Sequence, residues 1–199
     1  CTILDNKYIK YKTYTMLRAT VLFCFLILSF TSLAESVPGF YQIDMIVFEH
    51  QNKGQQSELF STKASSEKQN AIPLQFDRSN LKTPYHLLPS ASSQLNQEYW
   101  ALNHRSNYKV LFHYTWLQPN NNQQAIFIPP TTQGNWSVEG TLRIRQNSYY
   151  VLDTDLIFSS PKSQKKAFVF SQQQRMKPGT VYYLDHPMAG MLIKVHQVA

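Results

Sequence analysis

The sequence predicts an α+β fold: a mostly antiparallel β-sheet with one main helix packed on it. Three observations lead to this prediction. Apolar and polar residues alternate along several segments rich in β-branched and aromatic residues, as in strands with one buried face. Short polar stretches containing Asn or Pro separate these segments, which is typical of hairpin connections. A single segment near the middle of the chain shows helical spacing of its apolar residues.

The chain begins with a segment that resembles an export signal. Basic residues surround Met16, an apolar run covers 19–30, and Ser32-Leu-Ala34 supplies small residues at the −3 and −1 positions of a cleavage site. We therefore interpret 16–34 as a cleaved signal peptide and 1–15 as upstream read-through. A signal anchor is the alternative, but the apolar run is shorter than the roughly 20 residues that span a bilayer.

Export leaves a single predicted domain, 35–199. Removing 34 of the 199 residues leaves 165, and the formal charge falls from +7 to +4 because four Lys or Arg and one Asp are removed. Both cysteines lie in the removed part, so the mature domain is expected to have no disulfide and no cysteine ligand or nucleophile. A location outside the cytoplasm and a weak positive charge speak against a nucleic-acid partner.

The first expected strand covers 41–48, YQIDMIVF. It carries apolar residues on both faces, which indicates a central strand covered on both sides. The polar stretch 50–70, rich in Gln, Ser and Lys, is expected to form a long surface loop. Residues 71–90 contain three prolines and are expected to be irregular.

The expected helix begins at Ser92 or Ser93, either of which suits an N-cap, and ends near His104. Its apolar residues stand at i, i+4 and i+7 and so form one stripe, which we expect to pack on the sheet. The stripe consists of Leu95, Tyr99 and Leu102.

A strand at 108–116 is expected to follow the helix, and its alternate residues form one apolar face. That face comprises Tyr108, Val110, Phe112, Tyr114 and Trp116. A short edge strand is expected at 125–128, before Pro129-Pro130.

The C-terminal part shows the most regular alternation. In 138–144, apolar residues alternate with polar and charged ones, as in a strand with one wet face. A turn at 147–148 leads into 149–158, where Asp153 and Asp155 lie opposite the apolar residues. The remaining expected strands are 167–173, 181–184 and 191–198, the last two on either side of Asp185-His186-Pro187.

No complete catalytic or metal-binding pattern is present in the sequence. The six His residues include no pair at i, i+2 or i, i+4, and no G-x-S-x-G motif occurs. We therefore expect no metal, no cofactor and no enzymatic activity, and a structural or surface role for His113. Asp153 and Asp155 have a spacing that suits a glycosidase. The favoured interpretation is a solvated face on which they pair with Arg143 and Arg145 across the hairpin.

Asp185-His186-Pro187 is the remaining cluster with chemical potential. An adjacent acid and base in a sharp turn suits catalysis. The favoured interpretation is structural: Asp185 accepts hydrogen bonds from backbone N–H groups, and Pro187 restricts the turn backbone.

Several segments, taken in order, carry a family resemblance. The chain reads YQIDMIVFE at 41–49 and YKVLFHYTWLQP at 108–119, and it ends with Arg175-Met176 and YYLDHPMAGMLI at 182–193. These segments resemble the CsiV family of periplasmic, peptidoglycan-binding cell-shape proteins. The C-terminal Tyr-Leu-Asp-His-Pro-x-x-Gly-x-Leu is the most specific part. Charges of the family pattern are lost near 148–151 and 174–183, whereas apolar and turn positions are retained, so the resemblance supports the fold more than the binding contacts.

The resemblance implies a non-catalytic periplasmic protein that binds peptidoglycan. It also implies support for a bifunctional murein synthase, through the outer-membrane lipoprotein that activates it, and so for wall assembly and cell shape. Motif positions with an expected structural role are Trp116, Asp185, His186, Pro187 and Gly190. The alternative is an envelope protein-interaction module whose wall binding is weak and nonspecific.

Peptidoglycan offers sugar hydroxyls, N-acetyl groups and stem-peptide carboxylates, which aromatic rings beside Arg residues can bind. The expected carboxylate partners are Arg143, Arg145 and Arg175, and the expected ring platforms are Trp136 and Tyr149. A wet sheet face is the favoured alternative for the arginines. Core packing is the alternative for the aromatic residues, and it is stronger for Trp116 than for Trp136, which follows Gly134-Asn135.

Overall fold

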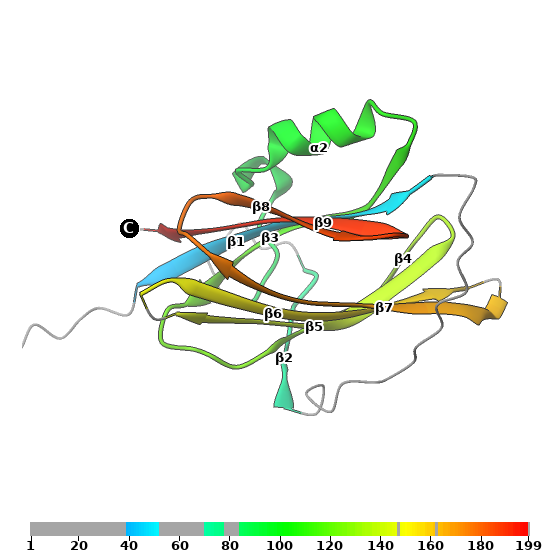
Figure 1. Ribbon diagram of the computed structural model, residues 1–199. Helices are drawn as coiled ribbons and strands as arrows, with labels where there is room; N and C mark the ends of the chain where they lie inside the picture. Colours follow the sequence, from blue (N-terminus) through cyan, green and yellow to red (C-terminus); the bar gives the residue numbers. More distant parts are fainter. Residues whose placement is uncertain (1–38, 52–69, 78–83, 147, 162, 199) are drawn as a thin grey trace, which may run out of the picture. The chain divides into compact units, whose positions relative to one another are not determined.

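The computed structural model describes residues 39–51, 70–77, 84–146, 148–161 and 163–198 (Figure 1). The expected signal peptide, the read-through segment and nearly all of the polar stretch 50–70 lie outside these residues. The described residues all belong to one compact unit, Pro38–Ala199.

Two β-sheets make up this unit. The first sheet has the strand order β3-β1-β9-β8 and the second the order β2-β4-β5-β6-β7, and every pairing is antiparallel except β2 with β4. The first sheet comprises β1 (Phe40–His50), β3 (Tyr108–Pro119), β8 (Val181–His186) and β9 (Ala189–Val198). The second comprises β2 (Ile72–Pro73), β4 (Ile126–Gln133), β5 (Trp136–Gln146), β6 (Tyr150–Ser160) and β7 (Ser163–Met176).

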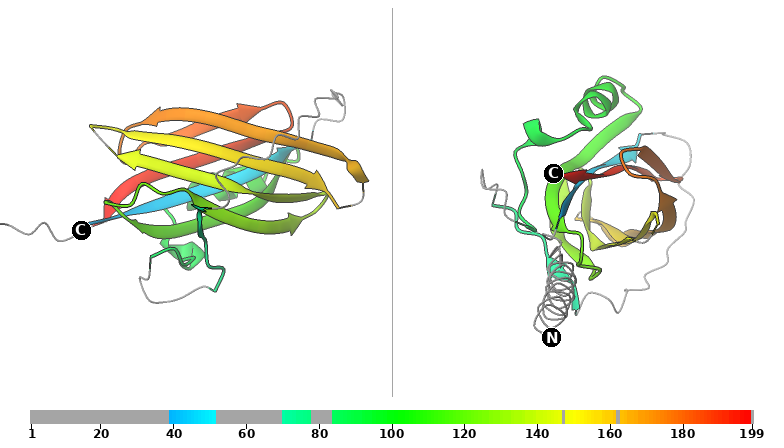
Figure 2. Two further views of the ribbon diagram at one scale, coloured as in Figure 1. Left: turned by 90° about the horizontal axis from the view of Figure 1, so that it is seen from below. Right: turned by 90° about the vertical axis from the view of Figure 1, so that its left-hand side faces the viewer.

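The α+β prediction is wrong, because the fold is essentially all-β. An antiparallel sheet needs a cover for its apolar face, and here each sheet covers the other. Figure 2 shows the two curved sheets facing each other across the interior. Within the described ranges the only α-helix is α2 (Asn96–Asn103), and none of its residues is fully buried.

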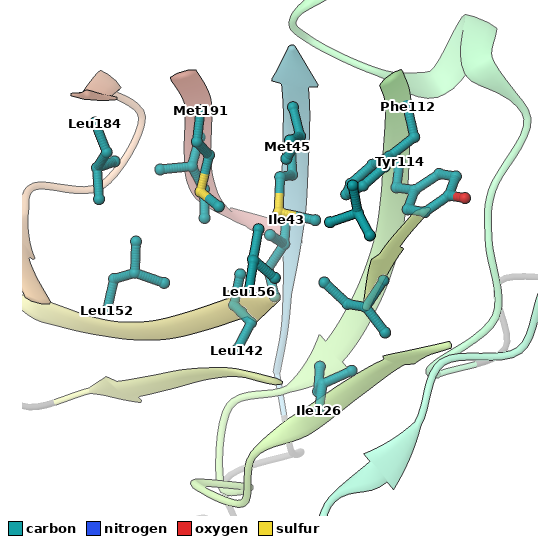
Figure 3. Close-up of a cluster of buried hydrophobic side chains, with 14 of the residues drawn as sticks. Ile43, Met45, Phe112, Tyr114, Ile126, Leu142, Leu152, Leu156, Leu184 and Met191 are labelled. Atoms are coloured by element: carbon teal, nitrogen blue, oxygen red, sulfur yellow. The ribbon is translucent and has the colours of Figure 1, made fainter. Parts of the chain in front are cut away.

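The main core fills the space between the two sheets. Ile43 and Met45 of β1 face Leu142 and Leu156 of the second sheet (Figure 3). The strand alternation predicted for the C-terminal part is confirmed at these positions, since Val138, Leu142, Ile144, Leu152, Leu156 and Phe158 are at most 1 % exposed. The prediction that β1 is central is also confirmed: it pairs with β3 on one side and β9 on the other, and Tyr41–Phe48 is buried throughout.

β3 departs from the single apolar face expected for it. Its register with β1 slips by one residue between Val47 and Phe48, so Leu111 lies in a bulge without a partner. A one-residue slip reverses the direction of every side chain beyond it. Phe112, Tyr114 and Trp116 therefore enter the main core, whereas Tyr108 and Val110 face a second apolar cluster on the outer side of the first sheet.

α2 lies on that outer side (Figure 1). A 3₁₀ turn, η2 (Ser90–Ser92), precedes it, and Ser93 Oγ accepts a hydrogen bond from the Leu95 backbone N–H at 3.1 Å. The predicted stripe packs on the second cluster: Leu95 is fully buried beside Ile46, and Tyr99 is partly buried there. No helix among the described residues has the length and apolar character needed to cross a membrane.

Candidate functional site

The outer face of the second sheet carries most of the charged residues that the sequence singles out. Strand pairing places Arg143 opposite Asp153, and it places Arg145 and Arg175 on either side of Val151. We call this surface the arginine face. It consists of Arg143, Arg145, Val151, Asp153, Asp155, Ser171, Gln173 and Arg175.

Hydrogen bonds within the arginine face satisfy its carboxylates. Arg145 Nη2 donates to Asp153 Oδ2 at 2.6 Å, and Gln173 Nε2 donates to the other oxygen of the same carboxylate. Asp155 accepts a hydrogen bond from Ser171 Oγ. This is the geometry of a hydrogen-bonded strand face, in which both carboxylates accept hydrogen bonds from neighbouring strands, as the favoured interpretation expects.

Arg175 and Tyr149 form a cation–π pair at the edge of this face. The Arg175 guanidinium carbon lies 3.3 Å from the centroid of the Tyr149 ring. No ion pair of this guanidinium with a carboxylate is found in the described ranges, and Arg175 is an exposed residue. The structure thus brings two predicted ligand residues together, with a charged planar donor group at an exposed position.

Trp136 does not have the position that the sequence indicates. It opens β5 instead of lying in a loop, is only 7 % exposed, and packs edge-on against Phe168 with ring centroids 5.1 Å apart. It is therefore a core residue, as in the alternative that the sequence leaves open for it. Trp116, for which core packing is the stronger expectation, is fully buried.

The Asp185-His186-Pro187 cluster lies at the β8–β9 hairpin, and its two titratable residues point to opposite faces of the strand. His186 stacks on Phe168 with ring centroids 4.6 Å apart, and its Nδ1 accepts a hydrogen bond from the Met188 backbone N–H. Burial lowers the pKa of His186, although the nearby Asp185 acts in the opposite direction. Asp185 lies on the outer face instead, where it accepts a hydrogen bond from Tyr183 Oη. The two residues do not form an acid–base pair.

A buried polar cluster on the first sheet is absent from the sequence predictions. Asp44 is fully buried on the side of β1 opposite the main core. Its carboxylate accepts hydrogen bonds from Thr115 Oγ1 at 2.8 Å and from Gln42 Nε2 at 3.1 Å, and His196 Nδ1 lies 3.7 Å away. The available signal was a lone carboxylate in the apolar run YQIDMIVF.

Polar contacts of this cluster and its neighbours connect the η2–α2 segment to the first sheet. Gln42 Nε2 donates to the Ser92 carbonyl at 2.8 Å, Gln94 Nε2 contacts His196 Nε2 at 2.9 Å, and His113 Nε2 lies 2.7 Å from Ser93 Oγ. The structural role expected for His113 agrees with this contact. Groups of three or more residues that could hold a metal ion are not found within the described ranges.

Comparison with known families identifies the family of this chain. The family described as "Peptidoglycan-binding protein, CsiV" matches residues 16–198. The chain belongs to the CsiV family. No curated protein and no solved structure matches it. The description of the CsiV family gives peptidoglycan binding as the function, and this function implies a location in the cell envelope.

The motif residues of the CsiV resemblance lie in the core and in one hairpin. Trp116 contributes to the core between the sheets, and the Asp-His-Pro segment forms the tight β8–β9 hairpin, with His186 opposite Ala189. Gly190 follows that hairpin on β9, where a side chain would collide with aromatic rings. The most specific part of the CsiV resemblance therefore lies in a turn and its packing.

Proposed function

We propose that this protein is a non-catalytic, periplasmic peptidoglycan-binding accessory protein, exported by a cleaved signal peptide. In this proposal it supports wall assembly and cell shape through a bifunctional murein synthase and the outer-membrane lipoprotein that activates this synthase. CsiV membership supports the peptidoglycan binding. The export, the enzyme partner and the activator are inferred from the sequence and the family resemblance.

The main support for a specific contact with peptidoglycan is the cation–π pair of Arg175 and Tyr149. The guanidinium carbon lies 3.3 Å from the ring centroid, and the group has no carboxylate partner in the described part of the chain, so it is available for a bidentate bond to an incoming carboxylate. Arg145 lies two strands away on the same face, at roughly 10 Å by ordinary strand spacing. Stem peptides carry carboxylates, and we assign their binding to this face.

The test is co-sedimentation of the purified protein with isolated murein sacculi at low and high salt. We expect binding that persists at high salt, because bidentate and stacked contacts are screened less than exposed charges. Binding that is absent, or that disappears with salt, contradicts the proposal. It would instead favour an envelope protein-interaction module with weak, nonspecific wall attraction.

Matched variants locate the contact. Arg175→Ala should weaken sedimentation with sacculi at least several-fold, whereas Lys177→Ala removes the same charge from an exposed position nearby and should change little. Arg175→Lys keeps the charge but loses the planar fork, so we expect it to behave like Arg175→Ala. Full binding by Arg175→Lys would indicate that only net charge matters.

A further inference from the structure

A second surface, on the other sheet, has the chemistry of a carbohydrate site. The rings of Phe48 and Tyr183 lie nearly parallel at 11°, with centroids 6.2 Å apart. Tyr108 packs edge-on against Phe48 at 5.3 Å. We call this surface the aromatic platform. It consists of Phe48, His50, Tyr108, Tyr183 and Asp185, contributed by β1, β3 and β8 on the outer face of the first sheet.

Gly190 makes the platform possible. This glycine lies between Phe48 of β1 and Asp185 of β8 in the strand register. A Cβ atom at Gly190 would lie 2.5 Å from Phe48 Cζ and 2.9 Å from Tyr183 Cε2, distances that real Cβ atoms do not show. The two rings therefore rest directly on the backbone of β9. The glycine of the family motif thus leaves the space that these two rings occupy.

The Tyr183 ring is exposed yet held in place. Its residue is 53 % exposed, which is high for a large hydrophobic residue. The ring stacks on Phe48, and its Oη donates a hydrogen bond to Asp185 Oδ1. Partial burial and the hydrogen-bonded carboxylate of Asp185 both raise the pKa of Tyr183, so the phenol stays protonated as this donor. An oriented ring with a solvent-exposed side loses little conformational freedom when a ligand stacks on it.

Asp185 adds a hydrogen-bond acceptor beside the Tyr183 ring. Its side chain is 62 % exposed, and no hydrogen bond from the described residues reaches its Oδ2 atom. This oxygen is an acceptor for hydroxyl or amide N–H groups. An exposed carboxylate repels acidic stem peptides, so the platform favours the neutral part of peptidoglycan. A pyranose offers an apolar C–H face to an aromatic ring and hydroxyl and N-acetyl donors at its edge.

We propose that Tyr183 and Asp185 form a binding site for the amino-sugar strand of peptidoglycan. Tyr183 stacks against a sugar ring, and Asp185 Oδ2 accepts a hydrogen bond from a hydroxyl or N-acetyl N–H group. The inference rests on the proposed peptidoglycan binding and deepens it. The two faces then bind different parts of the polymer: the arginine face binds stem-peptide carboxylates, and the aromatic platform binds the glycan.

The test uses tetra-N-acetylglucosamine, a neutral probe without stem peptides, added to the isotope-labelled full protein. We expect amide NMR shifts at β8, β9 and the end of β1, saturating with the probe concentration. Tyr183→Ala should weaken binding at least tenfold, and Asp185→Asn several-fold. Tyr183→Phe keeps the ring and should retain most of the affinity. Trp100→Ala is the control, since this α2 residue is 59 % exposed outside the platform and its loss should leave the affinity unchanged.

The outcomes separate the two proposals. Sacculi that bind the protein while the tetrasaccharide does not would overturn the glycan site and leave the proposed function standing. Equal loss in Trp100→Ala and Tyr183→Ala would also overturn the site, as would unchanged affinity in both Tyr183→Ala and Asp185→Asn. Tetrasaccharide binding without sacculus binding would support the sugar site and contradict the proposed wall function. Circular dichroism of each variant confirms that it is folded.

Discussion

Thr115 donates a hydrogen bond to Asp44 across the β1–β3 pair at 2.8 Å, and both side chains are almost inaccessible to solvent. A buried carboxylate is costly unless donors surround it, and Gln42 supplies the second donor. The same Gln42 amide reaches the Ser92 carbonyl ahead of α2. The polar cluster thus links the centre of the first sheet to the segment that covers its outer side.

The first prediction concerns this hydrogen bond. Thr115→Val removes the donor while keeping the side-chain shape, and it should lower the free energy of unfolding by about 1–3 kcal/mol because the buried Asp44 carboxylate loses the shorter of its hydrogen bonds. Urea denaturation measures the change. In the background of Asp44→Asn, the same substitution should cost less, since no charge remains to be satisfied. Equal costs in the two backgrounds would show that Thr115 and Asp44 are not coupled.

The second prediction concerns acid stability. Burial lowers the pKa values of His186 and His196 below their ordinary value of 6.5. At a pH below about 6.5 the unfolded chain therefore binds more protons than the folded one, so the contribution of these residues to stability is complete above this pH. It is lost as the pH falls from there toward the folded-state pKa values. The melting temperature should be lower at pH 5 than at pH 7.5.

His196 allows a direct check of this sign. Asp44 raises its pKa and Lys194 lowers it, but burial has the largest effect. His196→Asn should flatten the dependence of the melting temperature on pH between 7.5 and 5, whereas His104→Asn, at an exposed site at the end of α2, should not. A steeper dependence in His196→Asn would mean that protonated His196 stabilises the fold through Asp44.

The third prediction concerns Gly190. Gly190→Ala forces Phe48 or Tyr183 to move, and we expect a loss of about 1–3 kcal/mol, the usual cost of overpacking a well-filled site. Gly39→Ala is the matched control, because its Cβ would meet only the mobile amide end of Asn120, at 3.0 Å. Differential scanning calorimetry of both variants tests the difference. Equal melting temperatures would show that the rings over Gly190 move aside without cost.

The fourth prediction separates core packing from ligand binding at Trp136. Trp136→Ala removes a ring packed against Phe158 and Phe168 and should cost about 3–5 kcal/mol of stability. Binding to sacculi, measured per folded molecule at low temperature, should remain at the wild-type level. A variant that is as stable as wild type but loses binding would show that Trp136 is a ligand-binding residue.

Local pattern was enough to locate most strands. A period of two in apolar residues reports burial of one face whatever lies opposite, so β5 and β6 were predictable from 138–144 and 149–158. Apolar residues on both faces of 41–48 identified β1 as a central strand. The turn at Pro187 and the pairing of Arg145 with Asp153 also follow from residues that are close in sequence.

The candidate site was only partly predictable. Arg175 and Tyr149 are both named by the sequence, but their stacking depends on the pairing of β6 with β7. The aromatic platform joins β1, β3 and β8, whose residues are far apart in the chain. Trp136 resembled a loop residue because Gly134-Asn135 precedes it, and the packing against Phe168 reverses that interpretation.

Alternation of apolar residues located most strands and, for β5 and β6, the side that faces the core, because side-chain alternation is a local property of extended backbone. The tertiary structure sets how these segments divide between two sheets, since the pairing of distant strands cannot be deduced from their alternation. It also decided that the second sheet, rather than α2, covers the core face of β1. The slip at Leu111 and the burial of Asp44 follow from those pairings, because the side on which a residue lies depends on its partners across the sheet.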